Sequence, residues 1–591
     1  MFTLLLYRTF SANPITYDPD TKLLTIDAAE EYTSDTIIDY RNDCTKAIIT
    51  GSYNSIPRNL FKGAQALATV DIKASIQYIF ASAFSNCPLL TSINMPDSVK
   101  SIGQSTFEGC TSLQTLTFPK SCRTVQSSLF KGCTALTTID LSHVNELGRN
   151  SFEGCTNLQT VTCSKVLLSV KPNCFLNCAK LTEISGLENN EWFTFESNAF
   201  KGCTLLTTMK ISRTQTEIPN NAFEGCSKLR VTLHDGIKRI AEFAFTNTGL
   251  TELEVPSELT ELGGSSFKGC QELTRVDFSY AQKLATISSS AFSDCTKLST
   301  VLFTNKIVTI GQESFKNCNI KELKLPSGLR YLNSRAFASN AGLTNVAFFG
   351  MNQQLGSNIF NGCTSLTKIS FTGSLEPPYP TDIFAGITGL KEILFCDSLA
   401  PTAESDQLSQ YSGIKVIVKP GFGSSTFFGV QVTAEGEASC QALYPMEPND
   451  PAPKSPPPPS PEKTYCPVGG ESVFSPDGCA QNNPTQNDDP GNNNPGNDNP
   501  GNNSTNNNNN NTNNNTNNSS GNGENPIVNP DKDATSSPSK PSDSDGKSNQ
   551  AAIIAGSVVG TVAVVAIAAG VVFYFIKSKS TPVKIEGDIE P

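Results

Sequence analysis

Cysteine is the reactive residue type that recurs most regularly in this chain of 591 residues. Eleven of its 19 cysteines lie three residues after a phenylalanine, at Cys87, Cys110, Cys133, Cys155, Cys178, Cys203, Cys226, Cys270, Cys295, Cys318 and Cys363. A recurring thiol can form disulfides, bind zinc or pack as a small apolar side chain. Disulfides are disfavoured because the side chains of stacked thiols point in parallel, and because an odd number of cysteines would leave one unpaired. Zinc is disfavoured because no C-x-x-C pair is present. We therefore interpret the series as buried free thiols and expect neither a metal nor a cofactor.

The other eight cysteines include two pairs suited to disulfides. Cys396 and Cys440 flank the end of the apolar part of the chain, and Cys466 and Cys479 lie 13 residues apart in a polar region. An extracellular, oxidising compartment would permit both bonds. Both pairs are hypotheses, because connectivity cannot be read from a sequence.

The sequence contains few of the residues and motifs that common catalytic sites use. The only histidines are His143 and His234, and the chain has no Ser-His-Asp order, acidic metal-binding cluster, P-loop or dinucleotide fingerprint. Glu252 and Glu254 form a carboxylate pair, but on an open strand no burial tunes an acid. The formal charge of −11 argues against nucleic acid, whose phosphates attract basic surfaces. We therefore expect a protein that is not an enzyme and that binds no nucleic acid.

The phenylalanines that precede the cysteines mark an internal repeat, and a repeat decides the fold. They lie 22 to 25 residues apart, at Phe61, Phe84, Phe107, Phe130, Phe152, Phe175, Phe200, Phe223, Phe245, Phe267, Phe292, Phe315, Phe337, Phe360 and Phe384. The unit reads approximately A-F-x-G-C-T-x-L-T-x-I-x-I-P-x-x-V-x-x-I-x-x-x, as in AFKGCTLLTTMKISRTQTEIPNN from Ala199. Its average period of about 23 residues lies in the range of leucine-rich repeats.

Each position of the unit has a physical reason. Phe107, Cys110 and Leu113 are spaced by threes, which predicts one side of a short helical turn. Leu116 and Phe118 then alternate as a short strand does. The residue two after each Phe is Gly nine times, Asn four times, and Asp and Ser once each, which is the set that adopts a left-handed conformation. Stacked units are expected to align their Phe, Leu and Ile side chains in continuous ladders.

The expected fold class is a leucine-rich-repeat solenoid, in which each repeat contributes a short strand plus a helical turn or irregular segment. The unit resembles the BspA-type leucine-rich repeats, also called the Treponema pallidum type, over roughly residues 50 to 400. That family includes bacterial surface antigens and surface proteins of mucosal parasitic protists such as trichomonads. The resemblance implies a surface protein that adheres to host cells or extracellular matrix.

The strands should expose side chains on both sides of their central apolar residue, and solenoids use such faces for contact. We take these outward positions as the candidate ligand face: Thr115, Thr117, Thr138, Asp140, Thr160, Thr162, Glu183, Thr208, Lys210, Glu252, Glu254, Arg275, Asp277, Glu322 and Lys324. The alternative is a sheet that is merely solvated, because threonine favours strands in any case.

From residue 447 to 550 the composition becomes Pro-rich and then Asn-rich. Such a segment cannot bury enough apolar area to offset its conformational entropy, which predicts a disordered stalk. It contains the candidate N-glycosylation sites Asn502, Asn503, Asn510, Asn514, Asn517 and Asn518. Glycans there would stiffen the stalk and leave the solenoid bare, although an Asn-rich tract also produces such sequons by composition alone.

Residues 551–576, AAIIAGSVVGTVAVVAIAAGVVFYFI, carry no charge and predict a single transmembrane helix. Lys577 and Lys579 follow at once, and basic flanks stay in the cytoplasm, so the solenoid should lie outside the plasma membrane. Gly556 and Gly560 form a G-x-x-x-G that would pack two such helices in a weak homodimer. The first residues, MFTLLLYRTFSA, have a shorter apolar run than a usual signal peptide. Three interpretations are open: the segment is a minimal signal peptide, the start codon is misplaced, or the terminal membrane span leads the chain into the membrane.

The expected organisation has six segments. They are an N-terminal cap in residues 1–50, about 15 repeats in 51–400, a C-terminal cap in 401–446, the stalk in 447–550, the membrane helix in 551–576 and a cytoplasmic tail in 577–591. The expected function is a cell-surface adhesin or recognition protein that binds host-cell or matrix proteins or glycans. The alternative is a structural or antigenic coat, in which the solenoid is a spacer without a specific ligand.

The stalk disulfide is directly testable. Peptide mapping under non-reducing conditions is expected to recover Cys466 and Cys479 in one linked species, because an oxidising compartment favours closure of so short a loop. Recovery of both residues as free thiols would exclude the bond.

Overall fold

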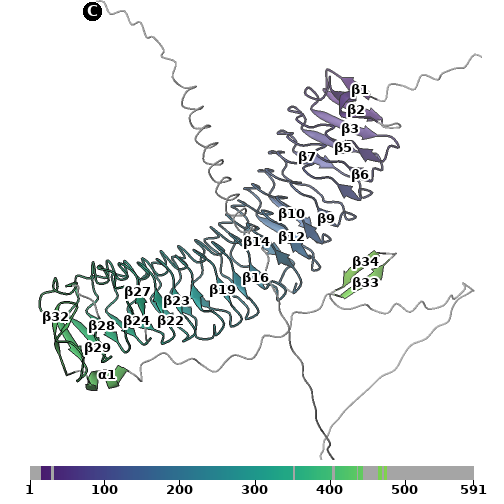
Figure 1. Cartoon of the computed structure of the whole chain (residues 1–591). Coiled ribbons are helices and arrows are strands. Elements are labelled where there is room, and N and C mark those ends of the chain that lie inside the picture. Colours follow the sequence, from purple (N-terminus) through teal and green to yellow (C-terminus); the bar gives the residue numbers. More distant parts are fainter. Residues whose placement is uncertain are drawn as a thin grey trace, which may run out of the picture. The chain divides into compact units, whose positions relative to one another are not determined.

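The computed structural model describes residues 15–27, 32–188, 190–350, 353–401, 406–435, 437–443, 464–468 and 471–475. Between an antiparallel strand pair at each end, these residues form a stack of coils, each one repeat long, that follow one another in chain order (Figure 1). The parallel pairing of neighbouring coils confirms the predicted leucine-rich-repeat solenoid.

One series of strands lies at the predicted strand of the unit, and we call it the first sheet. Its strands are β5 (Thr69–Ile72), β7 (Ser92–Asn94), β10 (Thr138–Leu141), β12 (Thr160–Cys163), β14 (Glu183–Ser185), β18 (Glu252–Glu254), β20 (Arg275–Asp277), β22 (Thr300–Leu302), β24 (Glu322–Leu325), β26 (Asn345–Phe348), β28 (Lys368–Phe371), β29 (Glu392–Phe395) and β30 (Lys415–Val418). Strands such as β10, β18 and β24 bury their central residue and expose the residues beside it, as the alternation predicted. Three strands depart from this pattern: Val301 in β22 is only partly buried, and Ser370 in β28 and Leu394 in β29 are buried beside the central residue.

A second parallel series, which we call the second sheet, was not expected from the sequence. Its two-residue strands are β4 (Ser55–Ile56), β6 (Tyr78–Ile79), β8 (Ser101–Ile102), β9 (Thr124–Val125), β11 (Glu146–Leu147), β13 (Ser169–Val170), β15 (Thr194–Phe195), β16 (Glu217–Ile218), β17 (Arg239–Ile240), β19 (Glu261–Leu262), β21 (Thr286–Ile287), β23 (Thr309–Ile310), β25 (Tyr331–Leu332) and β27 (Gln354–Leu355). Two residues are too short for a period of two to be visible in a sequence.

The segment after each Phe is a hydrogen-bonded turn, so the expected helical turn was wrong. The Cys110 N–H donates to the Phe107 carbonyl and the Leu113 N–H donates to the Cys110 carbonyl, each at 3.1 Å. Spacing by threes fits both such successive turns and a helix, which is why the sequence did not separate them. Among the described residues the only helices are the 3-10 helix η1 (Ser34–Ile37) and α1 (Glu437–Leu443).

These turns also join neighbouring coils. The N–H groups of Ser105, Phe107 and Gly109 donate to carbonyl oxygens of the next coil at 3.0, 3.0 and 2.8 Å. Gly109 has the predicted positive φ, at 74°, and so does the residue two after every repeat Phe. Ser105, two before the Phe, also has a positive φ of 56°, which the sequence analysis missed. Together the two left-handed residues aim alternate N–H groups along the stack, where they find partners.

The core lies between the two sheets and the turns, and its largest members are the repeat phenylalanines. From Phe61 to Phe360 each ring stacks on the next, with centroids 5.2 to 6.1 Å apart and interplanar angles of 2 to 18°. The predicted ladder is therefore confirmed. Offset stacking adds about 0.5–1.5 kcal/mol per aromatic pair beyond area burial.

The eleven repeat cysteines are buried and free, which confirms their interpretation as a thiol ladder. Each also donates its S–H to the carbonyl of the Phe in the preceding coil; Cys110 reaches Phe84 at an S···O distance of 3.1 Å. Asn340 stands where one coil lacks the cysteine, and its Nδ2 donates to the equivalent Phe315 carbonyl at 2.8 Å. The cysteine is thus both a small apolar side chain and the donor that a buried carbonyl requires.

The ends of the stack differ from its middle. At the N-terminus β1 (Ile15–Asp18) pairs antiparallel with β2 (Leu23–Asp27), and β2 then pairs parallel with β3 (Lys46–Thr50), so parallel stacking begins inside the expected cap. At the C-terminus β31 (Thr426–Phe427) and β32 (Val430–Thr433) form an antiparallel pair beside β30. Cys396 after β29 and Cys440 in α1 form a disulfide, so one proposed pair is present in the structure.

Several expectations concern residues beyond this stack. In the segment expected to be a disordered stalk, β33 (Thr464–Val468) and β34 (Glu471–Ser475) form an antiparallel hairpin. Cys479, the Asn502–Asn518 sequons, Gly556, Gly560 and the span 551–576 lie outside the described residues. Within the part of the chain that is described, no helix is long and apolar enough to cross a membrane.

The thiol ladder makes stability depend on pH. Burial raises the pKa of Cys155, Cys226, Cys318 and Cys363 from the ordinary 9.0 to about 12. A folded pKa above the unfolded one means that the stabilisation is complete below about pH 9. It is lost as pH rises from there towards about 12, because the unfolded chain ionises first.

Replacing Cys155 and Cys226 by Ser is expected to flatten this alkaline loss. Each buried thiol steepens the fall of the unfolding free energy by about 1.4 kcal/mol per pH unit, so the double variant should lose about 2.7 kcal/mol per pH unit less. Trp192, the only tryptophan, lies between the two sites in the sequence and reports urea unfolding by fluorescence between pH 9.5 and 11. A Thr248→Ser control, at the equivalent position of a coil without the cysteine, should match the unaltered chain. Equal slopes of the unfolding free energy against pH for all three proteins would contradict the raised pKa of the buried thiols.

Candidate functional site

The outward side chains of the first sheet lie where the sequence analysis placed them. Every residue of the candidate ligand face is exposed or partly exposed beside a buried or partly buried central residue. Strand pairing sets them in rows that run along the stack. Thr138, Thr160 and Glu183 share one row, and Glu252 and Arg275 share another.

The face is not continuous, because the pairing of the first sheet is interrupted. The sheet stops after β7, β14 and β22 and resumes at β10, β18 and β24. Thr115, Thr117, Thr208 and Lys210 lie in coils without a paired strand, so the structure separates them from the rows that were expected to continue through them.

The cause of one interruption is visible in the sequence. In the coil of Phe223, the apolar residues Val231 and Leu233 follow Leu229 by two and four positions, whereas other coils use three and five. Such a slip of one residue moves a strand out of register with its neighbours. Only a single bridge, between Thr208 and Arg230, remains there among the described residues.

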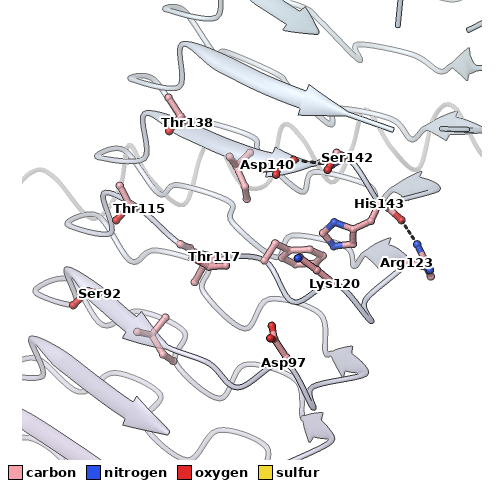
Figure 2. A pocket seen from close by; sticks show the side chains of 14 residues that line it. Ser92, Asp97, Thr115, Thr117, Lys120, Arg123, Thr138, Asp140, Ser142 and His143 are labelled. Carbon is pink, nitrogen blue, oxygen red and sulfur yellow. Dashed lines mark hydrogen bonds between the residues drawn. The ribbon is translucent and has the colours of Figure 1, made fainter. Parts of the chain in front are cut away.

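An open hollow of about 730 Å³ lies at the first interruption (Figure 2). Thr115, Thr117, Thr138 and Asp140 of the candidate ligand face line it together with Ser92. Residues that follow the strands also line it: Asp97, Lys120, Arg123, Ser142 and His143. The rest of the lining is apolar: Ile93, Leu116, Phe118 and Ile139. The residues after the strands were not predicted, because they lie in irregular segments; the basic pair Lys120 and Arg123 was the signal available in the sequence.

Hydrogen bonds hold the polar groups of this hollow in place. Asp140 Oδ1 accepts the Ser142 N–H at 2.9 Å, and this backbone hydrogen bond is the main cause that lowers the pKa of the carboxyl group. Lys120 and His143 lower it further by their charges. Asp140 therefore presents a carboxylate at neutral pH.

His143 and Arg123 are fixed by the backbone. The His143 Nε2–H donates to the Pro119 carbonyl at 3.0 Å, and the imidazole stacks on Phe118 with centroids 5.9 Å apart. Arg123 Nη1 donates to the His143 carbonyl at 3.0 Å. The hollow thus offers hydroxyl, carboxylate and guanidinium groups in defined positions, an arrangement suited to polar recognition.

Charge pairs occupy parts of the remaining face. Arg275 Nη2 lies 2.6 Å from Asp277 Oδ2, Lys210 pairs with Glu191, and Lys368 Nζ lies 2.7 Å from Glu392 Oε1.

A second open hollow, of about 550 Å³, lies at the interruption after β14 and is lined by Lys210, Thr208 and Glu183 among others. No group of His, Cys, Asp and Glu side chains that could hold a metal ion occurs among the described residues.

The sequence matches the BspA-type leucine-rich repeat region (six copies) over residues 34–158, 78–203, 193–318 and 285–405, more than half of the chain. The comparison with curated proteins gives no match.

Solved structures of similar fold include three bacterial proteins. A leucine-rich repeat protein from Bacteroides ovatus is 22% identical, with a TM-score of 0.46, and the match covers 70% of this chain and all of that one. The T. pallidum leucine-rich repeat protein is 23% identical, with a TM-score of 0.27, over 32% of this chain and 86% of its own. The pneumococcal vaccine antigen PcpA is 15% identical, with a TM-score of 0.32, over 69% and 98%. On the sequence match, this chain belongs to the BspA-type leucine-rich repeat family.

Proposed function

We propose that this chain is a cell-surface adhesin or recognition protein that binds host-cell or matrix macromolecules through the candidate ligand face. The observation that carries the proposal is the set of rows of exposed polar side chains along the stack of coils, with the hollow at Thr115, Thr117 and Asp140 between two of them. Membership of the family supports an interaction or surface role, since solenoids of this kind are typically scaffolds for contact and not enzymes.

The anchoring part of the proposal rests on the sequence. The uncharged span 551–576, followed by Lys577 and Lys579, would hold the solenoid outside the plasma membrane. The Cys396–Cys440 disulfide supports this location, because such bonds persist in oxidising compartments.

A coat protein without a specific ligand is the second candidate. Its support is the internal pairing of charges on the face, as in Arg275 with Asp277 and Lys368 with Glu392, which leaves those groups less available to a partner. A single saturable affinity for host cells or matrix favours the adhesin, and its absence favours the coat.

Charge reversal tests the face. The triple variant Glu252→Lys, Glu254→Lys and Lys324→Glu is expected to change the affinity for immobilised matrix proteins or host cells about tenfold, at roughly 0.5 kcal/mol for each exposed charge. A matched control, Lys62→Glu with Glu108→Lys and Glu242→Lys, makes the same net change on the turns. Binding that is unchanged in the triple variant, or changed equally in the control, would exclude this part of the face.

Orientation is tested by antibody labelling of intact cells. An antibody to residues 50–440 is expected to label cells before permeabilisation, and protease shaving should remove the label, because the solenoid is proposed to lie outside. Labelling that appears only after permeabilisation would place the repeats inside the cell and overturn the adhesin.

A further inference from the structure

Two coils are one residue shorter than the rest between the repeat Phe and the following core Leu or Ile. That spacing is five from Phe245 to Leu250 and from Phe315 to Ile320, and six in the other thirteen coils. Each shortened coil carries a strand, β18 and β24, at which the first sheet resumes. In the full-length coils the additional residue lies at the surface of the turn. Its absence from the two shortened coils leaves the surface of their turns set back from that of the neighbouring coils.

The first shortened coil has a glycine at the recessed position. A Cβ on Gly249 would lie 2.6 Å from the Ser227 carbonyl oxygen, so this coil packs directly against the preceding backbone. The coils on either side are of full length there, and they project Lys228 on one side and Gln271 and Glu272 on the other. The result is a hollow of about 780 Å³, which we call the Gly249 notch, lined among others by Thr208, Lys228, Arg230, Gly249, Gln271 and Glu272.

The second shortened coil provides an internal comparison. There Lys321 Nζ donates to Asn319 Oδ1 at 2.9 Å, and the same Nζ lies 2.6 Å from where a Cβ of Gly342 would be. Side chains of this coil therefore occupy the recess that the shortening creates. The Gly249 notch is open because glycine takes the place of such a side chain.

The charges of the notch are unbalanced towards the positive. Lys228 and Arg230 are exposed, and neither forms an ion pair with another described residue. Glu272 is paired with Lys297, whose Nζ lies 2.8 and 2.7 Å from its two carboxylate oxygens. That pairing is the main cause that lowers the Glu272 pKa, and Arg230 and Lys228 lower it less. Lys228 and Arg230 are therefore available to bind an anionic ligand.

The shape and lining indicate the kind of anion. Neighbouring coils are about 4.8 Å apart, so the full-length coils flanking the notch are about 10 Å apart, room for one extended chain. The lining consists of charged, amide, hydroxyl and glycine groups without an aliphatic or aromatic side chain among the described residues. Protein partners usually anchor on buried aromatic or aliphatic groups, which this notch does not offer. Sugars bearing anionic groups match a lining of cations and hydrogen-bonding groups.

We propose that the Gly249 notch binds an acidic saccharide, a sugar chain carrying carboxylate or sulfate groups, through Lys228 and Arg230. Gln271 and Thr208 supply hydrogen bonds to its hydroxyl groups. The site extends the proposed surface function, but it is separate from the charges tested at Glu252, Glu254 and Lys324. Loss of one therefore does not imply loss of the other.

The test measures binding of three hexasaccharides to the purified full-length chain by calorimetry: a sulfated heparin fragment, a hyaluronan fragment with carboxylates only, and neutral maltohexaose. The sulfated or the carboxylate probe, or both, should bind, and maltohexaose should not. Which of the two acidic probes binds identifies the anionic group. In the double variant Lys228→Gln with Arg230→Gln, affinity should fall at least about tenfold.

The control variant is Lys180→Gln with Lys391→Gln, which removes two cations from the same positions of other coils. It should keep its affinity within about twofold, and all variants should keep the same Tm, because these side chains are exposed. Failure of both acidic probes to bind, or equal losses in the two variants, would overturn the site. A hexaglutamate peptide that binds as tightly and depends equally on Lys228 and Arg230 would overturn its assignment to saccharides.

Discussion

Hydrogen bonding between the turns of neighbouring coils is the constraint on which this structure depends. From Phe61 to Phe337, three alternate N–H groups of each turn donate to the following coil, and left-handed residues on both sides of the Phe make this geometry accessible. The same spacing brings each repeat Phe ring onto the next and places the cysteine S–H against the preceding Phe carbonyl. A coil that lost this geometry would leave buried polar groups without partners.

Much of this regular scaffold could be predicted, because it is repeated. Fifteen occurrences of one pattern identified the Phe ladder, the left-handed residue after it and the buried thiols. The turn was mistaken for a helix because Phe107, Cys110 and Leu113 have the same spacing in both. The second sheet was missed because strands such as β6 contain only two residues. The hydrogen-bonding role of cysteine is a tertiary property, visible only once the Phe84 carbonyl lies beside Cys110.

The candidate site was predicted less completely than the fold, for a physical reason. Alternation identifies which residues of a strand face outward, and Thr138, Asp140 and Glu252 do so. Hollows, however, arise where the repeat is irregular, and an average pattern discards that information. Lys120 and His143 join the face only because the first sheet is interrupted beside them. Regular coils thus supply the repeated scaffold, and irregular coils supply the distinctive surface.

The one-way direction of the turn hydrogen bonds has a consequence for how such a gene changes. From Phe61 to Phe337, the turn of each coil presents donors to its successor and acceptors to its predecessor, so an additional copy inserted between two such coils would leave the turn groups of neither neighbour unsatisfied. Duplication or deletion of one repeat's coding sequence therefore changes the length of the solenoid and preserves its packing. Only the ends are fixed, by the β1–β2 hairpin and by the Cys396–Cys440 disulfide. The length of the solenoid can therefore change in steps of one whole coil.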